Sequence, residues 1–71
     1  MVSKTLRKFG DRVREERLKR SLSQEQLAAK AGVHRTYIGM IERAEKNITL
    51  ENIQKIAGAL NIKLSEIFRD I

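Results

Sequence analysis

The chain has 71 residues, and its 15 Lys and Arg outnumber its nine Asp and Glu to give a formal net charge of +6. This length predicts one domain, 1–71, which buries about 60% of the surface that the unfolded chain exposes. There is no cysteine, one histidine, and no apolar run near the roughly 20 residues of a membrane span. These counts exclude disulfides, zinc fingers and thiol chemistry, and we expect a cytoplasmic protein without metal, cofactor or membrane partner.

The positive charge is concentrated near the start of the chain. Eight of the 15 basic residues precede residue 21: Lys4, Arg7, Lys8, Arg12, Arg14, Arg17, Lys19 and Arg20. A field of this sign attracts nucleic acid or an acidic membrane surface. Asp11, Glu15 and Glu16 alternate with the basic residues, which disfavours the membrane. Charge alone leaves two alternatives, a nucleic-acid surface and a solvated basic helix face.

Helical spacing of apolar residues recurs along the whole chain, which lacks proline and any sustained alternation of period two, so the fold class is all-α. The first helix is predicted over about Thr5–Arg20. Its inward stripe comprises Leu6, Phe9, Val13 and either Arg17 or Leu18. Gly10 is expected to weaken this helix by about 1 kcal/mol relative to alanine.

The second helix begins with the clearest start signal of the chain. Ser23 and Gln26 have the spacing of a capping box, and Gly32 suits the left-handed turn after a helix. A third helix follows over about His34 to Arg43 or Ala44. His34 is interpreted as a helix-start residue and not a ligand. The apolar positions of the two helices are Leu27, Ala28, Ala31, Ile38 and Ile41.

Two further helices complete a compact five-helix fold. Thr49 caps a helix over Leu50–Leu60, which Asn61 ends. Its predicted apolar face is Leu50, Ile53, Ile56, Ala57 and Leu60. A short fifth helix is expected over about Ser65–Asp70.

The segment Gln24–Arg43 has the requirements of two short helices that meet at a wide angle. Ala28 is small where the helices approach, Gly32 accommodates the turn, and Val33 fills the angle between them. Such a pair holds its second helix outward, where it can enter the major groove of DNA.

This segment resembles the helix-turn-helix of the phage-repressor-like (XRE) family. The similarity runs from Ser23-Gln24-Glu25-Gln26-Leu27 through Gly32-Val33-His34 to Arg35-Thr36-Tyr37-Ile38, and it covers about residues 5–70. The run Arg35-Thr36-Tyr37-Ile38, with Ile41-Glu42-Arg43 and Asn47-Ile48-Thr49, is most similar to controller proteins of restriction-modification systems. Similar runs also occur in other small XRE regulators. The resemblance implies a phage-repressor-like domain that binds double-stranded DNA.

Arg35, Thr36 and Met40 are the candidate base-contacting residues. Arg35 and Thr36 lie in the first turn of the third helix, which reaches base edges in this motif. Arginine can donate two hydrogen bonds to guanine, which discriminates by about 1–3 kcal/mol. Met40 can contact a thymine methyl group. The alternatives are a phosphate contact for Arg35 and solvent exposure for Met40.

A second set of residues is expected at the DNA backbone or the groove edge: Gln24, Tyr37, Gly39, Arg43, Lys46 and Asn47. The family implies a phosphate contact for Gln24, whose alternative is a polar helix start. Tyr37 either meets a phosphate or packs on the second helix. Gly39, expected to face outward, either permits close approach to DNA or serves helix packing. The last three residues either clamp phosphates or form a solvated loop.

Two structural expectations accompany this site. The resemblance implies an ion pair between Glu42 and an arginine of the first helix, which alignment through Ser21-Leu22 identifies as Arg17. The terminal segment 64–71 carries more apolar surface than a small monomer needs. Leu64, Ile67, Phe68 and Ile71 are therefore expected at a homodimer interface, the alternative being a helix absorbed into the monomer core.

The function expected is that of a homodimeric transcription regulator on a near-palindromic operator, with no small-molecule effector. The resemblance to controller proteins implies activation of their own operon at low level and repression at high level. The alternatives are a small phage-type repressor and an antitoxin-like interaction module. An enzyme is disfavoured because the sequence has no paired carboxylates, no nucleophile beside a base and no phosphate-binding glycine loop.

Overall fold

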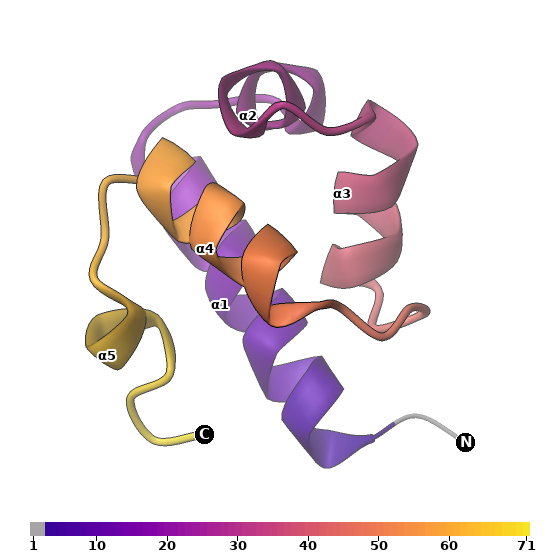
Figure 1. Ribbon diagram of the computed structural model, residues 1–71, viewed down its shortest axis with the longest axis vertical. Coiled ribbons are helices and arrows are strands. Elements are labelled where there is room, and N and C mark those ends of the chain that lie inside the picture. Colours follow the sequence, from indigo (N-terminus) through magenta and orange to yellow (C-terminus); the bar gives the residue numbers. More distant parts are fainter. Residues whose placement is uncertain (1–2) are drawn as a thin grey trace.

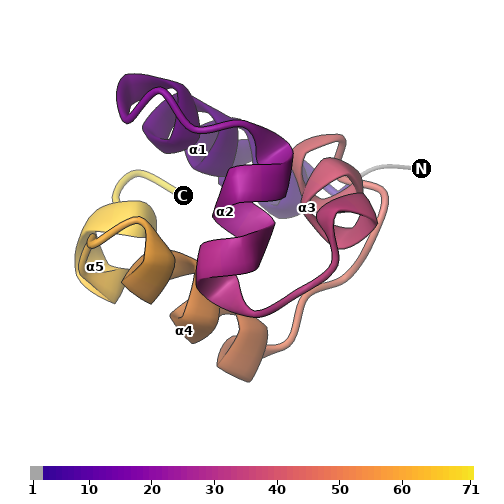
Figure 2. The same ribbon diagram turned by 90° about the horizontal axis from the view of Figure 1, so that it is seen from above.

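The computed structural model describes residues 3–71, which form five helices and no strand. The helices are α1 (Lys4–Lys19), α2 (Gln24–Ala31), α3 (Arg35–Glu42), α4 (Leu50–Ala59) and α5 (Leu64–Ile67). α1 and α4 overlap in the view of Figure 1 but lie on opposite sides of the molecule in Figure 2, and α2 lies across one end, with α3 to one side. The all-α, five-helix prediction is therefore confirmed.

Local sequence signals place the helix ends. The Ser23 hydroxyl accepts from the Gln26 amide while the Gln26 side chain accepts from the Ser23 amide, so the predicted capping box is formed. Gly32 adopts φ 74° and ends α2, as expected. Thr49 caps α4 through the amide of Asn52. Asn61 adopts φ 55° directly after the C-cap of α4.

The core lies where all five helices meet. Its residues have the predicted spacing along each helix, and the fully buried large side chains are Val13, Leu27, Ile38, Ile56, Leu60 and Ile67. Seen from above, α2 runs over the body of the molecule and α3 stands beside it (Figure 2). Leu27 of α2 and Ile38 of α3 belong to this core, which therefore helps to fix the angle between the two helices.

Gly10 on α1 marks the closest approach between α1 and α3. A Cβ atom built at Gly10 would lie 2.4 Å from the carbonyl oxygen of Ile41 and 3.1 Å from that of Glu42. No side chain fits at such a separation. Gly10 therefore permits the packing of α1 against the end of α3.

Some expected positions differ in the structure. Leu50 is 70% exposed and does not belong to the apolar face of α4, because it is the first residue of the helix, before the chain has turned toward the core. On α1, Arg17 is the buried residue and Leu18 is exposed. The last helix covers one turn, Leu64–Ile67, and is shorter than Ser65–Asp70 at its C-terminal end. Phe68 is the C-cap that ends this turn. The chain reverses two residues later at Asp70, which adopts φ 65°.

Candidate nucleic-acid interface

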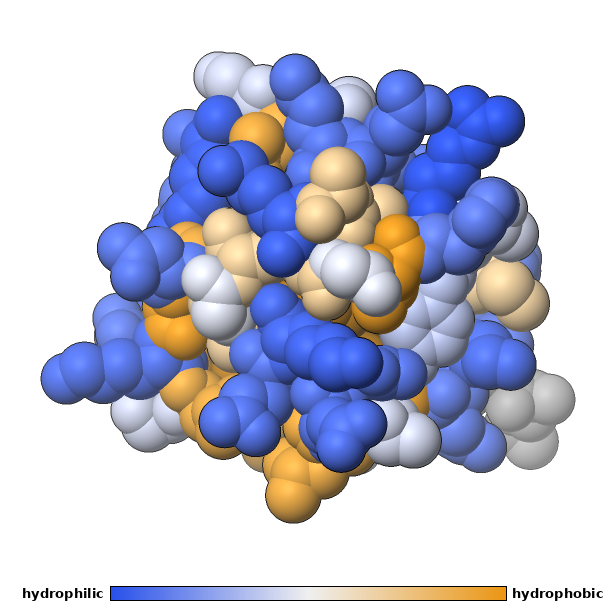
Figure 3. Space-filling model, turned by 45° about the horizontal axis from the view of Figure 1, so that its top comes forward, coloured by the Kyte–Doolittle hydropathy of each residue, from blue (hydrophilic) through white to orange (hydrophobic). Residues whose placement is uncertain are grey.

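A shallow groove lies between the start of α2 and the outward face of α3. It brings together several residues singled out by sequence, and its lining comprises Ser23, Gln24, Glu25, Arg35, Thr36, Gly39 and Arg43. Figure 3 shows that polar side chains cover most of one face of the molecule, with apolar patches between them and a larger apolar area toward the lower edge. Six of the seven residues that line the groove are polar or charged, so the groove offers hydrogen-bonding and charged groups.

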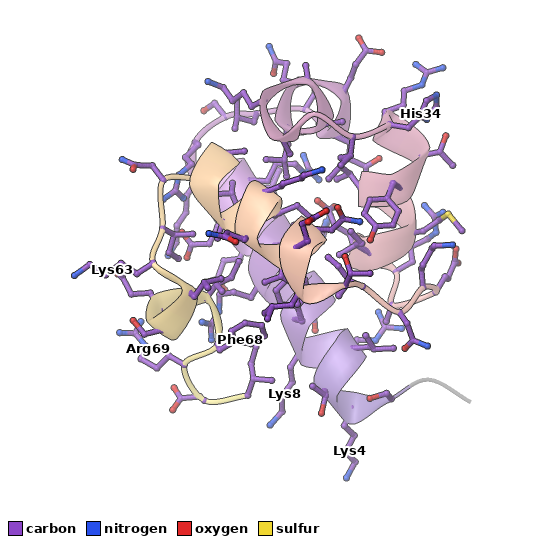
Figure 4. The ribbon with its side chains drawn as sticks, in the orientation of Figure 1. Lys4, Lys8, His34, Lys63, Phe68 and Arg69 are labelled. Carbon is purple, nitrogen blue, oxygen red and sulfur yellow. The ribbon has the colours of Figure 1, made fainter. Side chains whose placement is uncertain are left out.

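The first turn of α3 is held by its own N-cap. The Nδ1 atom of His34 accepts a hydrogen bond from the amide of Thr36 at 3.1 Å, so His34 is a helix-start residue, as expected. His34 lies at the outer end of α3 (Figure 4). Arg35 and Thr36 follow as the first two helical residues, and both are exposed. Amide groups at such a helix start favour anions.

Arg35 is paired within the groove. Its Nη1 atom lies 3.0 Å from Oε2 of Glu25, with side-chain exposures of 67% and 71%. So exposed a pair contributes little to stability, about 0–1 kcal/mol, and its partners can separate readily. Sequence reasoning did not single out Glu25, because the contact crosses the turn between α2 and α3 and has no local sequence signal.

Gln24 is positioned by a buried ion pair beneath the groove. Its Nε2 atom donates to Oε1 of Glu42 at 3.1 Å. Glu42 in turn pairs with Arg17, and both side chains are almost fully buried. The hydrogen bonds to Glu42 raise the pKa of the Arg17 guanidinium above its ordinary value, although burial opposes the shift. Arg17 and Glu42 thus form the pair that the resemblance implied.

Gly39 lies at the floor of the groove and not on the outward surface expected for it. A Cβ atom there would lie 3.0 Å from Nη1 of Arg43 and 3.4 Å from Oε1 of Gln24. The residue is buried by these two side chains, which accounts for a small residue in mid-helix. Met40, the next residue, is half-buried, so part of its side chain remains available at the surface.

Tyr37 faces α4, which neither alternative from the sequence included. Its hydroxyl oxygen accepts a hydrogen bond from Nδ2 of Asn52 at 3.0 Å, and its half-buried ring packs against the core. The hydroxyl proton remains available for a further acceptor. Asn52 was not anticipated, because residues 37 and 52 belong to different helices.

The loop after α3 carries the remaining basic candidates. Arg43, Lys46 and Asn47 are all exposed. The Nε atom of Arg43 lies 3.0 Å from a carboxylate oxygen of Glu45. The chain turns at Ala44, which has φ 58° and a buried side chain. Arg43 lines the groove, whereas Lys46 and Asn47 are not among its lining residues.

The terminal apolar residues divide between core and surface. Ile67 is 0% exposed, so it belongs to the core and is no longer a candidate for the dimer surface. Phe68 is half-buried and stacks on Phe9, with ring centroids 5.5 Å apart. Leu64 is 37% exposed and Ile71 is half-buried. Leu64, Phe68 and Ile71 retain apolar area at the surface, and we call them the terminal apolar surface.

Two further features of residues 3–71 bear on function. No helix in that range is long and apolar enough to cross a membrane. Those residues also contain no group of three or more His, Cys, Asp or Glu side chains that could hold a metal ion.

Comparison with known proteins gives consistent matches. A family model described as helix-turn-helix matches residues 13–67. The control protein C.BamHI of Bacillus amyloliquefaciens is 47% identical over 60 residues, which are 83% of this chain and 74% of that protein. The controller protein C.AhdI of Aeromonas hydrophila is 49% identical, with a TM-score of 0.87, over 89% of this chain and 96% of that one. The controller protein C.Esp1396I, solved as a tetramer with its natural 35 base-pair operator, is 33% identical, with a TM-score of 0.88, over 93% and 87% of the two chains.

Proposed function

The chain belongs to the helix-turn-helix family and, within it, to the controller proteins of restriction-modification systems, and from this premise we propose that it is a sequence-specific transcription regulator. The observation that carries the proposal is the exposed first turn of α3, where Arg35 and Thr36 stand beside the groove. The family consists of regulators that act by binding, and we propose the same here, in the cytoplasm and without a catalytic step.

In this proposal α3 enters the major groove and its first turn contacts base edges. Arg35 exchanges Glu25 for a guanine, Thr36 contacts a base or phosphate, and Met40 contacts a thymine methyl group. Gln24, Arg43, Lys46 and Asn47 contact the backbone, with the Tyr37 hydroxyl at the groove edge. Contacts of this second kind fix the position of the protein and do not themselves discriminate sequence.

The proposed binding unit is a homodimer on a near-palindromic operator. The terminal apolar surface supports this assembly, since Leu64 remains exposed although the core is already complete. Two α3 helices related by a twofold axis would contact half-sites about 34–36 Å apart. The related C.Esp1396I has been solved as a tetramer on its operator, so assembly on DNA occurs among relatives of this size.

Selection of bound sequences from a random DNA pool tests the proposal. We expect a site with two inverted half-sites separated by one helical turn. Recovery of sequences without a common motif would overturn sequence-specific regulation. Recovery of a single half-site would overturn binding as a dimer.

Leu64→Glu tests the assembly separately, because Leu64 is exposed and its replacement leaves the core intact. We expect a folded monomer in sedimentation that binds one half-site weakly. A dimer that persists at the wild-type strength would exclude Leu64 from the interface.

A further inference from the structure

Arg12 of α1 contacts the last turn of the chain through three hydrogen bonds. Its Nη1 atom donates to the carbonyl oxygens of Glu66 at 2.8 Å and Ile67 at 3.4 Å. Its Nη2 atom donates to the carbonyl oxygen of Arg69 at 2.8 Å. These contacts join residues more than 50 positions apart in the sequence, so one guanidinium links α1 to the end of α5.

The chemistry of α5 explains why such a contact matters. A helix of one turn is far below the length at which helices are stable by themselves. The carbonyl oxygen of Glu66 accepts only a long hydrogen bond of 3.2 Å from the amide of Arg69, which leaves it able to accept from a second donor, and the carbonyl end of a helix favours a cation. The planar guanidinium supplies several donors in a fixed arrangement, which suits neighbouring carbonyl oxygens better than a lysine ammonium does.

Three anchors hold α5 in place: Ile67 in the core, the Phe68 ring on Phe9, and the carbonyl groups on Arg12. The first two anchors are apolar contacts, and only Arg12 binds the backbone directly. Figure 4 shows Phe68 on the side of this turn toward α1, with Lys63 and Arg69 pointing away from the molecule. The side chains of the terminal apolar surface lie at and after this turn, so their placement depends on these anchors.

We propose that Arg12 is a positioning residue for dimerisation, which orients the terminal apolar surface without belonging to it. The proposal rests on the homodimer proposed above. A dimer binds more tightly when its interface side chains are ordered before contact, since ordering them during association costs free energy. Arg12 orders the terminal apolar surface from within the same protomer by holding the backbone of the last turn. Dimerisation therefore depends on a residue of α1.

The test compares Arg12→Ala with Arg14→Ala, which removes the same charge from an exposed position on the same helix. Sedimentation equilibrium gives the dimer dissociation constant of each. We expect Arg12→Ala to raise it about tenfold or more, because hydrogen bonds from a charged donor are among the stronger ones. Arg14→Ala should leave it close to the wild-type value. Arg12→Lys should lie between them, since one ammonium cannot reach all three carbonyl groups.

Amide hydrogen exchange keeps the proposal testable if Arg12→Ala also loses stability. The amides of Ile67 and Phe68 donate to the carbonyl groups of Lys63 and Leu64 within the turn. In the monomeric Leu64→Glu background, adding Arg12→Ala should accelerate exchange at these two amides while the amides of α2 and α3 keep their protection. Equal acceleration throughout the chain would overturn a positioning role, because it would indicate general destabilisation.

The remaining outcomes separate this proposal from the proposed function. A wild-type dimer whose dissociation constant is the same in Arg12→Ala and Arg14→Ala would overturn the role of Arg12 alone. A wild-type chain that stays monomeric with and without operator DNA would overturn the homodimer and, with it, the role assigned to Arg12.

Discussion

Arg17 and Glu42 form a buried, bidentate ion pair that joins α1 to the last turn of α3. Nε of Arg17 lies 2.7 Å from Oε2 of Glu42, and Nη2 lies 3.0 Å from Oε1. The third nitrogen, Nη1, donates to the carbonyl oxygen of Leu22 at 2.8 Å. Because Gln24 donates to the same carboxylate, one ion pair positions α1, the turn before α2, and a side chain of the groove.

Removal of one partner should therefore be costly. Glu42→Ala leaves the Arg17 guanidinium buried without its counter-ion, and we expect a loss of about 3–5 kcal/mol in the free energy of unfolding. Urea unfolding followed by circular dichroism measures it. Glu45→Ala, which removes an exposed carboxylate paired with Arg43, is the control and should change stability by less than about 0.5 kcal/mol.

The double variant Arg17→Met/Glu42→Leu distinguishes two quantities. One is the net contribution of the ion pair to stability, and the other is the penalty of leaving one buried charge without its partner. Apolar replacements leave no buried charge, so the double variant should be more stable than Glu42→Ala. It should still bind DNA less well, because Gln24 loses its acceptor. If Glu42→Ala and the control were equally stable, the pair would have no structural importance.

Gly10→Ala should destabilise the protein even though alanine is the better helix former. The added Cβ atom would meet the Ile41 carbonyl oxygen at 2.4 Å, which α1 and α3 relieve only by moving apart. We expect a net loss of about 1–3 kcal/mol, the typical cost of an overpacked interior. Thermal and urea unfolding both measure this change.

Gly58→Ala is the matched control, since Gly58 is also helical but has no heavy atom within 4 Å of a built Cβ. Its replacement should stabilise the protein by up to about 1 kcal/mol, the difference in helix propensity. Opposite signs for the two variants support the close approach at Gly10. A stabilising effect of Gly10→Ala would contradict it.

These two glycines also show how far sequence reasoning extends in this chain. The capping box at Ser23, the turn at Gly32 and the apolar spacing are local signals, and the structure agrees with them except at Leu50. The cost of Gly10 to α1 is also a local signal, and it stays a prediction. The benefit of Gly10 is not a local signal, since it depends on the backbone of α3, about thirty residues away. Local propensity contains no information about such a contact.

The candidate site likewise combines features that the sequence predicted with contacts that it did not. The motif predicted that Arg35 and Thr36 occupy the first turn of an exposed helix, because that placement follows from the cap and the helix start. The partners of Arg35, Tyr37 and Arg12 were not predictable, since each contact joins two separate elements. Leu50 shows a related limit: periodicity gave the face of α4 correctly, but the first residue of the helix remains in solvent.

Glu16 should make the stability of the protein sensitive to acid. Oε1 of Glu16 accepts from Arg20 at 2.7 Å, and this hydrogen bond lowers the pKa of the carboxyl, with burial opposing and Lys19 assisting. A carboxyl whose pKa is lower in the folded state stabilises that state at neutral pH. Its contribution is lost as pH falls through the range where the folded carboxyl takes up its proton. The difference between the unfolding free energies at neutral and acidic pH should therefore be smaller in Glu16→Gln than in the wild-type protein.

Glu15→Gln is the comparison, because it removes the same charge from an exposed neighbour on α1. It should retain most of the acid sensitivity of the wild-type protein. If the two variants had the same pH profile, the hydrogen bond from Arg20 to Glu16 would contribute nothing specific.

Lys46→Ala should reduce the dependence of DNA affinity on salt. Lys46 is exposed in the loop after α3, where the proposed function places a phosphate contact. Loss of one such contact lowers the slope of log affinity against log salt by about one. Lys63→Ala is the control, since Lys63 lies beside α5 on the opposite side of the molecule from α3 (Figure 4). Equal slopes for both variants and the wild type would exclude Lys46 from the interface.

Arg35→Ala should reduce discrimination between DNA sequences more than it reduces affinity for DNA in general. The exposed pair with Glu25 contributes little to folding, so the variant should unfold at nearly the wild-type free energy. Loss of a bidentate contact to guanine should cost about 1–3 kcal/mol on the selected operator. Fluorescence anisotropy with the selected operator and with scrambled DNA measures the two affinities.

Glu25→Gln distinguishes this role from a structural one. It removes the charge that pairs with Arg35 while keeping the guanidinium, so specific affinity should be retained or rise as Arg35 is released toward DNA. If Arg35→Ala lowered the affinity for operator DNA and for scrambled DNA equally, Arg35 would be a phosphate contact. No loss of affinity for either DNA in Arg35→Ala would exclude Arg35 from the interface.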